Sequence, residues 1–165
     1  MCCALKRTKE SPRVIFISGF SNSGKTTLIE RLIPRLRRLG LRVGTIKHAH
    51  EGFEPDRPGK DSWRHAQAGA CAVTLIAPKQ VASFIQTEQE TPLAPILHQM
   101  ASRADLVLVE GFKQVPGPRI LVEPNGLSRL KIEHSICHVG VFPKRLSASE
   151  LTKITQFCRG KDGDN

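Results

Sequence analysis

Gly19-Phe20-Ser21-Asn22-Ser23-Gly24-Lys25-Thr26 follows directly on the apolar run Val14-Ile15-Phe16-Ile17. The eight residues match G-x-x-x-x-G-K-[ST], the pattern of a loop whose backbone N–H groups surround a phosphate. Such a loop must turn tightly and leave room for the phosphate oxygens, and glycine, which has no Cβ, allows both. The alternative is an ordinary Gly/Ser-rich turn before a helix. Because a strand precedes the loop and a helical pattern follows it, we predict a phosphate-binding loop for a nucleoside triphosphate.

Two side chains of this loop have predicted roles of their own. Lys25 is placed to reach the β- and γ-phosphates as a point charge, and the Thr26 hydroxyl is placed to coordinate Mg²⁺. The helix that begins here has leucines at helical spacing and ends at Gly40. We expect Pro34 to kink this helix.

The rest of the chain alternates between strand and helix patterns, which is typical of a parallel sheet flanked by helices. The segment 105–110 is continuously apolar from Leu106 to Val109, which indicates a strand buried on both faces. Two apolar segments, 70–77 and 81–86, are separated by a Pro-Lys-Gln turn and predict an antiparallel hairpin. The predicted fold is α/β, a P-loop NTPase-like three-layer sandwich with a mostly parallel sheet and a small antiparallel hairpin. The other predicted strands are 13–18, 42–47, 119–123 and 137–142, and the predicted helices are 25–39, 61–68, 91–103 and 147–158.

Length and composition favour a single domain. With 165 residues and 39% hydrophobic composition, the chain can bury a normal core. We expect a P-loop domain at 13–159 between flexible tails at 1–12 and 160–165. No apolar run approaches the roughly 18 residues of a membrane span, and the N-terminus lacks the apolar stretch of a secretory signal. These features predict a cytoplasmic protein without membrane attachment.

The five cysteines form no C-x-x-C pair. Their odd number and their spacing favour neither a disulfide framework nor a structural zinc site. Cys71 and Cys137 lie in apolar stretches and are predicted to be small core residues. Cys2 and Cys3 could be lipidated or could bind a metal. The better explanation is that they have no function and belong to an N-terminal tail.

The formal net charge of +10 suggests an anionic ligand or partner. The basic residues are dispersed, and the densest group lies at the end of the first predicted helix. No aromatic-rich strand accompanies it, as single-stranded nucleic-acid binding would prefer. We therefore interpret these charges as a solvated face or a patch for an anionic ligand or acidic partner, and we do not expect nucleic acid to bind. The densest group is Arg35, Arg37, Arg38 and Arg42.

Glu110 ends the predicted buried strand and precedes Gly111. In a phosphate-loop protein, this is the place of the acid that holds Mg²⁺ through a water or orients an attacking water. The alternative is a strand-end carboxylate that points at solvent. The phosphate loop upstream favours the functional interpretation.

The loop from Lys47 to Ser62 follows the second strand, so it should emerge at the sheet edge where open α/β sheets bind ligands. Lys47, Arg57 and Lys60 are candidates for phosphate contacts. Asp56 and Asp61 are candidates for the Mg²⁺ shell. For Asp61, a role as the cap of a helix that begins at Ser62 is as good an explanation as Mg²⁺ binding. For Asp56, a solvated loop acid is a slightly better explanation than Mg²⁺ binding.

His48 and His50 form an H-x-H pair, which at strand spacing would place both imidazoles on one face and could hold a transition metal. No third ligand is evident nearby, so one packed and one solvated histidine is the favoured interpretation. The base of the nucleotide is not readable from the residues, since the chain has no [NT]-K-x-D guanine motif. Pro143-Lys144-Arg145, after the last predicted strand, is one position from which a base could be contacted.

Four motifs taken together resemble one family. They are G-F-S-N-S-G-K-T-T-L-I, T-I-K-H-A-H, D-R-P-G-K-D-S-W-R-H-A-Q-A-G-A and D-L-V-L-V-E-G-F-K, in this order. The chain strongly resembles the molybdopterin-guanine dinucleotide biosynthesis adapter proteins, the MobB family, from about residue 13 to residue 158. The phosphate loop occurs in many families, whereas the combination of D-R-P-G-K-D-S with V-E-G-F-K is far more specific.

The resemblance implies a homodimeric GTP-binding protein that assists the guanylyltransferase attaching GMP to molybdenum-bound molybdopterin. Its cofactors would be GTP and Mg²⁺, and it would present either the nucleotide or the anionic molybdopterin to the transferase. The implied phosphate-binding residues are Gly19, Ser21, Asn22, Ser23, Gly24, Lys25, Thr26 and Thr27, and the neighbouring site adds Lys47, His48 and Lys60. The implied catalytic residues are Glu110 and Asp61, and the implied metal-binding residues are Thr26, Asp61 and Glu110.

The resemblance also implies an adapter with at most slow GTPase activity, distinct from the guanylyltransferase itself. Phe20 stands where related nucleotide-switch ATPases carry an activating lysine, and Glu110 is followed by Gly-Phe-Lys instead of a water-positioning D-x-x-G-Q segment. The segment 141–145 departs from expectation because it lacks an acidic residue. Two other functions stay open on the residues alone: an ATP-dependent small-molecule kinase, and a metallochaperone GTPase that uses His48 and His50.

Overall fold

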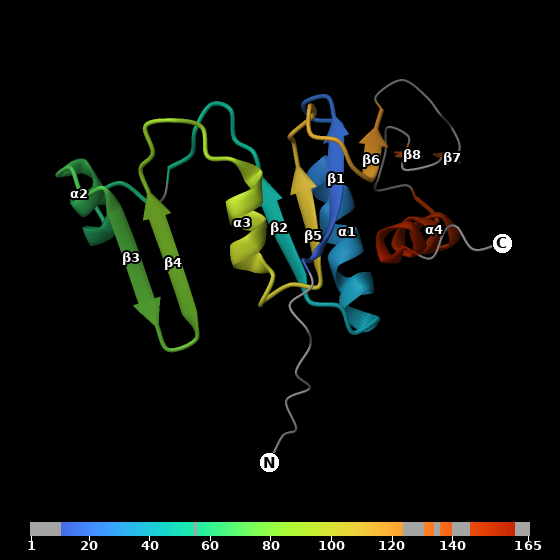
Figure 1. The fold of residues 1–165 in the computed structure, drawn as a ribbon, viewed down its shortest axis with the longest axis horizontal. Helices are drawn as coiled ribbons and strands as arrows, with labels where there is room; N and C mark the ends of the chain where they lie inside the picture. The colour runs from blue at the N-terminus through green and yellow to red at the C-terminus, as the bar shows by residue number, and fades with distance from the viewer. Residues whose placement is uncertain (1–10, 55, 124–130, 134–135, 140–145, 161–165) are drawn as a thin grey trace, which may run out of the picture. The chain divides into compact units, whose positions relative to one another are not determined.

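The computed structural model describes residues 11–54, 56–123, 131–133, 136–139 and 146–160 (Figure 1). They fall into two compact units: the described parts of Met1–His48 and Ala94–Asn165 form the first unit, and Ala49–Leu93 forms the second. Most of the predicted tails, and residues 140–142 of the last predicted strand, lie outside the described residues. The first strand begins at Arg13 and the last helix ends at Arg159.

The first unit is built on a six-stranded sheet in the order β2-β5-β1-β6-β8-β7. All neighbouring pairs are parallel except β7 and β8, which are antiparallel. The sheet is therefore mostly parallel, as predicted, with β1 near its centre. Its strands are β1 (Arg13–Gly19), β2 (Val43–Lys47), β5 (Leu106–Glu110), β6 (Arg119–Val122), β7 (Lys131–Glu133) and β8 (Ile136–Val139).

Helices cover both faces of this sheet and give the three predicted layers. On one face, α1 (Lys25–Arg38) and α4 (Ala148–Arg159) form one core with alternate strand residues such as Ile15 and Leu108. On the other face, Met100 of α3 (Leu93–Met100) lies against Gly44 of β2, where any Cβ would collide with it. The apolar run from Leu106 to Val109 is thus buried on both sides, which explains why it has no polar face.

The ends of α1 and α4 have local causes. Gly40 follows α1 at φ +82°, and its N–H donates to the carbonyl of Arg37 at 2.9 Å. The helix continues through Pro34, and the kink expected there stays a prediction. Ser147 and Glu150 form a reciprocal capping box at the start of α4, so two otherwise unpaired N–H groups are satisfied.

The second unit contains α2 (Asp61–Gln67) and the antiparallel pair β3 (Ala72–Ala77) and β4 (Gln80–Ile85). This confirms the predicted hairpin. On one of its faces the register pairs Ile76 with Val81 and Ala72 with Ile85, and the large side chains there are exposed: 80% for Ile76, 61% for Val81 and 68% for Ile85. We call Ile76, Val81 and Ile85 the apolar hairpin face.

Three predictions differ from the structure. Helix α3 spans Leu93–Met100 instead of 91–103, because it starts only after Pro92 and tightens into turns beyond Met100. Strand β7 was not predicted, since three residues are too short to show an alternating pattern. Cys71 is exposed and not a core residue, because it precedes β3, whereas Cys137 is buried as predicted. None of the described helices has the length and apolar composition needed to cross a membrane.

Candidate functional site

The loop after β1 has a backbone conformation that favours glycine at two positions. Gly19 has φ +155°, and a Cβ there would meet the carbonyl oxygen of Val122 and lie 2.7 Å from the Ser23 hydroxyl oxygen. Gly24 has φ +92° and forms the N-cap of α1. Asn22 also has a positive φ, +59°. The loop therefore turns back on itself against β6 before the helix begins.

The polar groups of the loop are arranged like those of an anion site. The hydroxyl of Ser23 is buried and, within the described part of the chain, has no hydrogen-bond partner. The first turn of α1 has neither an acidic residue nor a side-chain cap, so its N–H groups keep their positive field. Lys25 lies over the loop, with Nζ donating to the carbonyls of Gly19 at 3.2 Å and Phe20 at 2.6 Å. An anion would satisfy the hydroxyl and the helix end together.

Other predicted site residues lie at the same edge of the sheet. The register pairs Glu110 with Ile17 of β1 on one side and with Lys47 of β2 on the other. Because all three strands are parallel, Gly19, Lys47 and Glu110 end at one carboxyl edge. The structure thus brings Glu110 and Lys47 to the edge that holds the phosphate loop, as the sequence predicts.

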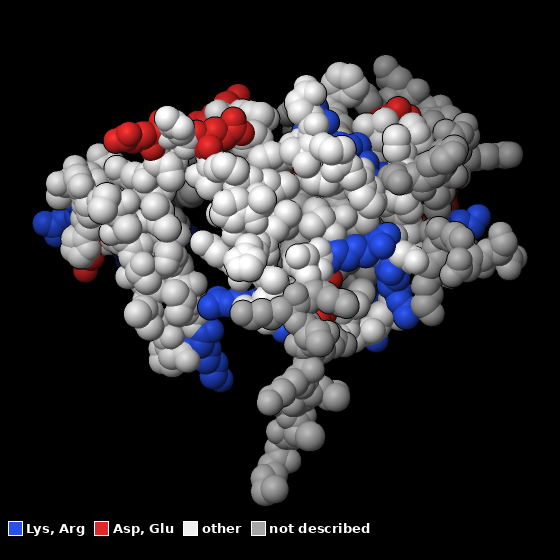
Figure 2. Space-filling view, viewed as in Figure 1, with Lys and Arg blue, Asp and Glu red and all other residues white. Residues whose placement is uncertain are grey.

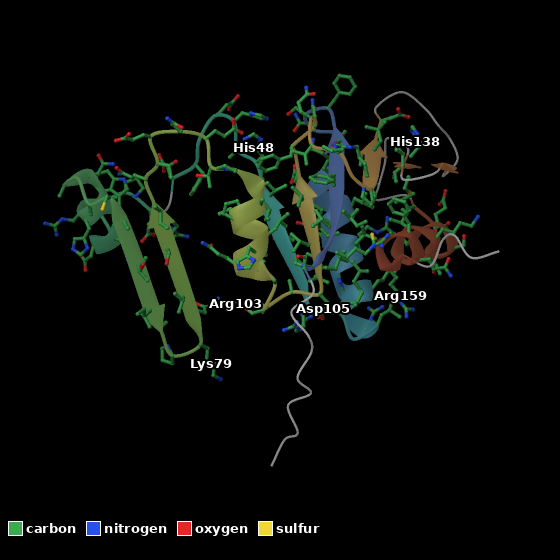
Figure 3. The ribbon with its side chains drawn as sticks, viewed as in Figure 1. His48, Lys79, Arg103, Asp105, His138 and Arg159 are labelled. Carbon is green, nitrogen blue, oxygen red and sulfur yellow. The ribbon has the colours of Figure 1, made fainter. Side chains whose placement is uncertain are left out.

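His48 is held by the turn that follows β5. Its N–H donates to the carbonyl of Glu110 at 2.9 Å, and its ring stacks on Phe112 with centroids 4.3 Å apart and planes 16° apart (Figure 3). Gly111 has φ +101°, and a Cβ there would lie 2.8 Å from the Cβ of His48. Gly111 and Phe112 of the V-E-G-F-K segment therefore pack against His48 of the T-I-K-H segment. The sequence analysis did not predict this contact.

Arg119, at the start of β6, was also missed by the sequence analysis. Its guanidinium donates to the Ser18 hydroxyl and to the carbonyls of Val115 at 2.6 Å and Phe112 at 3.4 Å. It also lies over the Phe16 ring at 5.2 Å, and partial burial lowers the pKa of the guanidinium. Arg119 thus anchors the segment between β5 and β6 to β1.

A cleft of about 320 Å³ opens beside this anchor. It shares Ser18, Gly19 and Phe20 with the end of β1 and the phosphate loop, and its other residues come from β6 and its flanks. Such a volume is at the small end of ligand sites. The other lining residues are Lys113, Arg119, Leu121, Val122 and Glu123.

The remaining predicted site residues belong to the second unit. Lys60 is the N-cap of α2, and Asp61 is its first residue, with a side chain 90% exposed and 4.0 Å from Arg64. The prediction that Asp61 caps a helix starting at Ser62 is therefore wrong; the acid lies inside the first turn, where it suits the helix dipole. The roles of Lys60 and Asp61 in nucleotide binding stay predictions.

Asp56 has a structural use within the second unit. Its carboxylate accepts hydrogen bonds from the Ser62 hydroxyl and, at 2.7 Å, from the N–H of Arg57. These bonds, chiefly the one from Ser62, lower the pKa of the carboxyl. Asp56 thus fixes the turn that leads into α2.

The H-x-H pair is not at strand spacing, because β2 ends at Lys47 and both histidines follow it. The geometric reason for placing both imidazoles on one face is therefore absent. No group of three or more metal-binding side chains was found among the residues that the structure describes. Pro143-Lys144-Arg145, predicted as a base contact, lies outside them.

Residues 14–138 match the family model of MobB, molybdopterin guanine dinucleotide synthesis protein B. The chain belongs to the MobB family. The matched residues include the phosphate loop, Glu110 and every residue that lines the cleft. The resemblance seen in the four motifs is thereby confirmed.

Curated MobB-family relatives agree with this assignment. The chain is similar to the molybdopterin-guanine dinucleotide biosynthesis adapter proteins of Haemophilus influenzae, at 43% identity over 68% of the chain, and of Escherichia coli K12, at 37% over 68%. It covers 64% and 66% of their lengths, just under two thirds.

Solved MobB structures share the fold. A crystal structure of molybdopterin-guanine biosynthesis protein B matches at 34% identity with a TM-score of 0.55, over 68% of this chain and 70% of that one. Bacillus subtilis MobB matches over 90% and 99% of the two chains with a TM-score of 0.65; at 22% identity it shows the likeness of fold alone.

Proposed function

We propose that this MobB-family chain is a GTP-binding adapter that assists the guanylyltransferase converting Mo-molybdopterin to molybdopterin guanine dinucleotide. The observation that carries the proposal is the shape of the phosphate loop, where Gly19 and Gly24 hold a turn that other residues cannot adopt without strain, around the buried Ser23 hydroxyl. The adapter role is taken from the names of the curated relatives.

The loop fits the triphosphate of a nucleotide. A Cβ at Gly19 would fill the turn, and the Ser23 hydroxyl, which has no partner among the described residues, is a ready donor to a phosphate oxygen. Lys25 would exchange its two carbonyl acceptors for the β- and γ-phosphates, with Lys47 and His48 as further contacts. Mg²⁺ would be held by Thr26 and Glu110 and would neutralise phosphate charge.

We propose that hydrolysis is slow at most and that the chain is not itself the transferase. Phe20 is 68% exposed and offers no positive charge to a leaving phosphate. The residues after Glu110 are used to pack His48, since Phe112 stacks on its ring. No side chain of that turn is thus assigned to positioning water.

We propose a homodimer that uses the apolar hairpin face. Exposed side chains of this size, gathered on one face of a two-stranded sheet, are typical of an interface. Light scattering of the wild type should give twice the monomer mass, and Ile76→Lys with Val81→Lys should give a monomer. A monomeric wild type would contradict the dimer.

The nucleotide proposal is tested by calorimetric titration of GTP and ATP, with and without Mg²⁺. Lys25→Ala should abolish binding without lowering the melting temperature, because the bonds of Lys25 to described residues go only to loop carbonyls. Lys153→Ala, an exposed lysine on α4, is the matched control. Unchanged GTP affinity in Lys25→Ala would overturn the phosphate-loop assignment, and a tenfold preference for ATP would contradict the choice of GTP.

The adapter proposal needs a separate test with the transferase. Purified guanylyltransferase should form more molybdopterin guanine dinucleotide when the wild-type chain and GTP are added than when Lys25→Ala is added. No effect of the wild type over a range of concentrations would count against the adapter role. We place this reaction in the cytoplasm, and cell fractionation checks that placement.

A further inference from the structure

Arginines gather at the amino edge of the six-stranded sheet, the edge opposite the phosphate loop. The N–H of Arg13 donates to the carbonyl of Asp105 at 3.0 Å, and the N–H of Asp105 donates to the carbonyl of Arg42 at 2.8 Å. The starts of β1, β5 and β2 therefore lie side by side at this edge. Arg37 and Arg38 belong to the last turn of α1, which leads into β2.

Helix α4 ends at the same edge. The guanidinium of Arg13 donates to the carbonyl of Phe157 at 3.2 Å, and Arg159 is the last residue of the helix. Figure 3 labels Arg103 and Arg159 on either side of Asp105 along this edge, and Figure 2 shows Lys and Arg side chains gathered over the lower half of α1 and beside α4. We call the exposed arginines of this edge the amino-edge arginines. They are Arg13, Arg37, Arg38, Arg42, Arg103 and Arg159.

The charge of this surface is only partly balanced within the described residues. Arg42 pairs with Asp105, with 2.9 Å between Nη2 and Oδ1. The other five amino-edge arginines have no ion-pair partner in the part of the chain that the structure describes. Cations near the C-terminus of a helix stabilise it, but the ends of two helices carry only about one negative charge between them. A net positive surface is left for something else to meet.

A nucleotide at the phosphate loop does not account for these charges. Strand β1 has seven residues from Arg13 to Gly19, so the two edges of the sheet lie about 20 Å apart at about 3.3 Å per residue. Interactions between exposed charges are largely screened beyond the Debye length, which is about 8 Å at physiological ionic strength. The amino-edge arginines therefore need a partner of their own.

We propose that the amino-edge arginines dock an acidic protein, a partner that presents a row of carboxylates. The proposal goes beyond the proposed function, because this surface is separate from the phosphate loop. A guanidinium holds a carboxylate through two parallel N–H groups, which an ammonium cannot do. Arginine is also enriched at protein interfaces, whereas lysine is depleted there. The chemistry of the surface thus matches the chemistry of the partner.

The apolar contact offered by this surface favours a protein over a nucleic acid. Leu39 follows Arg38 as the C-cap of α1 and is 46% exposed, so it can anchor a protein partner among the charges. Single-stranded nucleic acid binds best where its bases stack on aromatic side chains. The exposed phenylalanines among the described residues are Phe20 in the phosphate loop and Phe53 in the second unit, so neither belongs to the amino edge.

The test follows the binding of a fluorescein-labelled, glutamate-rich peptide to the full chain by fluorescence anisotropy. The wild type should bind the peptide. Arg37→Gln with Arg38→Gln, and separately Arg103→Gln with Arg159→Gln, should each weaken binding about tenfold, because each variant removes two carboxylate contacts. Glutamine is a good helix former, so both variants should fold, and circular dichroism checks this.

The matched control is Lys79→Gln with Lys153→Gln, which removes the same charge from two exposed lysines away from this edge. It should bind the peptide like the wild type, and an equal loss would mean that net charge alone sets the affinity and would overturn the proposal. Absence of peptide binding by the wild type, or unchanged binding in either arginine variant, would overturn it as well.

A single-stranded oligonucleotide with the same net charge as the peptide tests the other class of partner. Tighter binding of the oligonucleotide than of the peptide would overturn the choice of a protein. Both arginine variants should keep the GTP affinity of the wild type, so the outcome of this test is independent of the phosphate-loop assignment. A loss of GTP affinity in them would contradict the separation of the two edges.

Discussion

In the first unit, β5 buries four consecutive residues, Leu106 to Val109, whereas β3 in the second unit buries Val73 alone. Both strands are apolar in sequence, so hydrophobicity does not set the difference. β5 has a strand on each side and helices over both faces, while β3 has β4 on one side and one face that contains exposed Ile76. The comparison teaches that the first unit holds its own core and that the second leaves part of its apolar surface for something else to cover.

The largest expected effect tests that difference directly. Leu108→Ala should destabilise the protein by about 2–5 kcal/mol, because it removes a fully buried side chain and leaves a cavity. Leu75→Ala in β3, at 40% exposure, should change stability by about 1 kcal/mol or less. Urea unfolding followed by circular dichroism and by fluorescence of Trp63, the single tryptophan, measures both. Equal effects of the two changes would break the comparison.

The next effect compares two glycines. Gly19→Ala combines a strained φ with a collision against Val122 and Ser23. It should lower the free energy of unfolding by about 2–3 kcal/mol and abolish GTP binding. Gly52→Ala in the second unit has φ +80° but open space around the new Cβ, so strain alone should cost about 1 kcal/mol. The same unfolding assay and a GTP titration check this. Normal GTP binding by Gly19→Ala would show that the loop tolerates the side chain.

Helix caps sharpen the comparison at a smaller scale. Ser147→Ala removes the side chain that accepts a hydrogen bond from the N–H of Glu150. The free energy of unfolding should therefore fall by about 1 kcal/mol. Ser149→Ala, which keeps that cap, should stay within about 0.5 kcal/mol of the wild type. If the two variants unfold at the same urea concentration, the capping box contributes nothing measurable.

The smallest effect is a pH dependence local to the second unit. Because hydrogen bonds lower the pKa of Asp56, the turn they form is fully stable above the ordinary aspartate value of about 3.9 and is lost as the pH falls through the lowered pKa. Trp63 fluorescence should therefore change below that value in the wild type. Ser62→Ala should move the midpoint upward, because it removes the main cause of the shift. If the midpoint does not move, the Trp63 fluorescence does not report on the bond between Ser62 and Asp56, and the prediction is wrong.

The parts of the fold that the sequence predicts are those with a long or punctuated pattern. The loop glycines, the continuous apolar run of β5 and the turn between β3 and β4 each have a local physical cause, and each is confirmed. The end of α3 was predicted too late, since turns continue its spacing after the helix stops. β7 depends on its pairing with β8, which a three-residue segment does not reveal.

The site divides in the same way. The phosphate loop and Glu110 follow strands and can be placed at one sheet edge from the order of elements alone. The stacking of Phe112 on His48 and the anchoring role of Arg119 depend on residues far apart in sequence that meet only after folding. A charged residue such as Arg119 in a strand beside an apolar run is the one signal that could have drawn attention to the cleft.

The strand order has a consequence for a chain still emerging from the ribosome. β1 and the phosphate loop are made early, yet both strands that pair with β1 come from residues 106–110 and 119–122, and Gly19 packs against the Val122 carbonyl. Contacts between such distant segments form late and slowly. A product of interrupted synthesis that stops before Leu106 would contain every residue of the phosphate loop but neither of the strands that give the loop its shape.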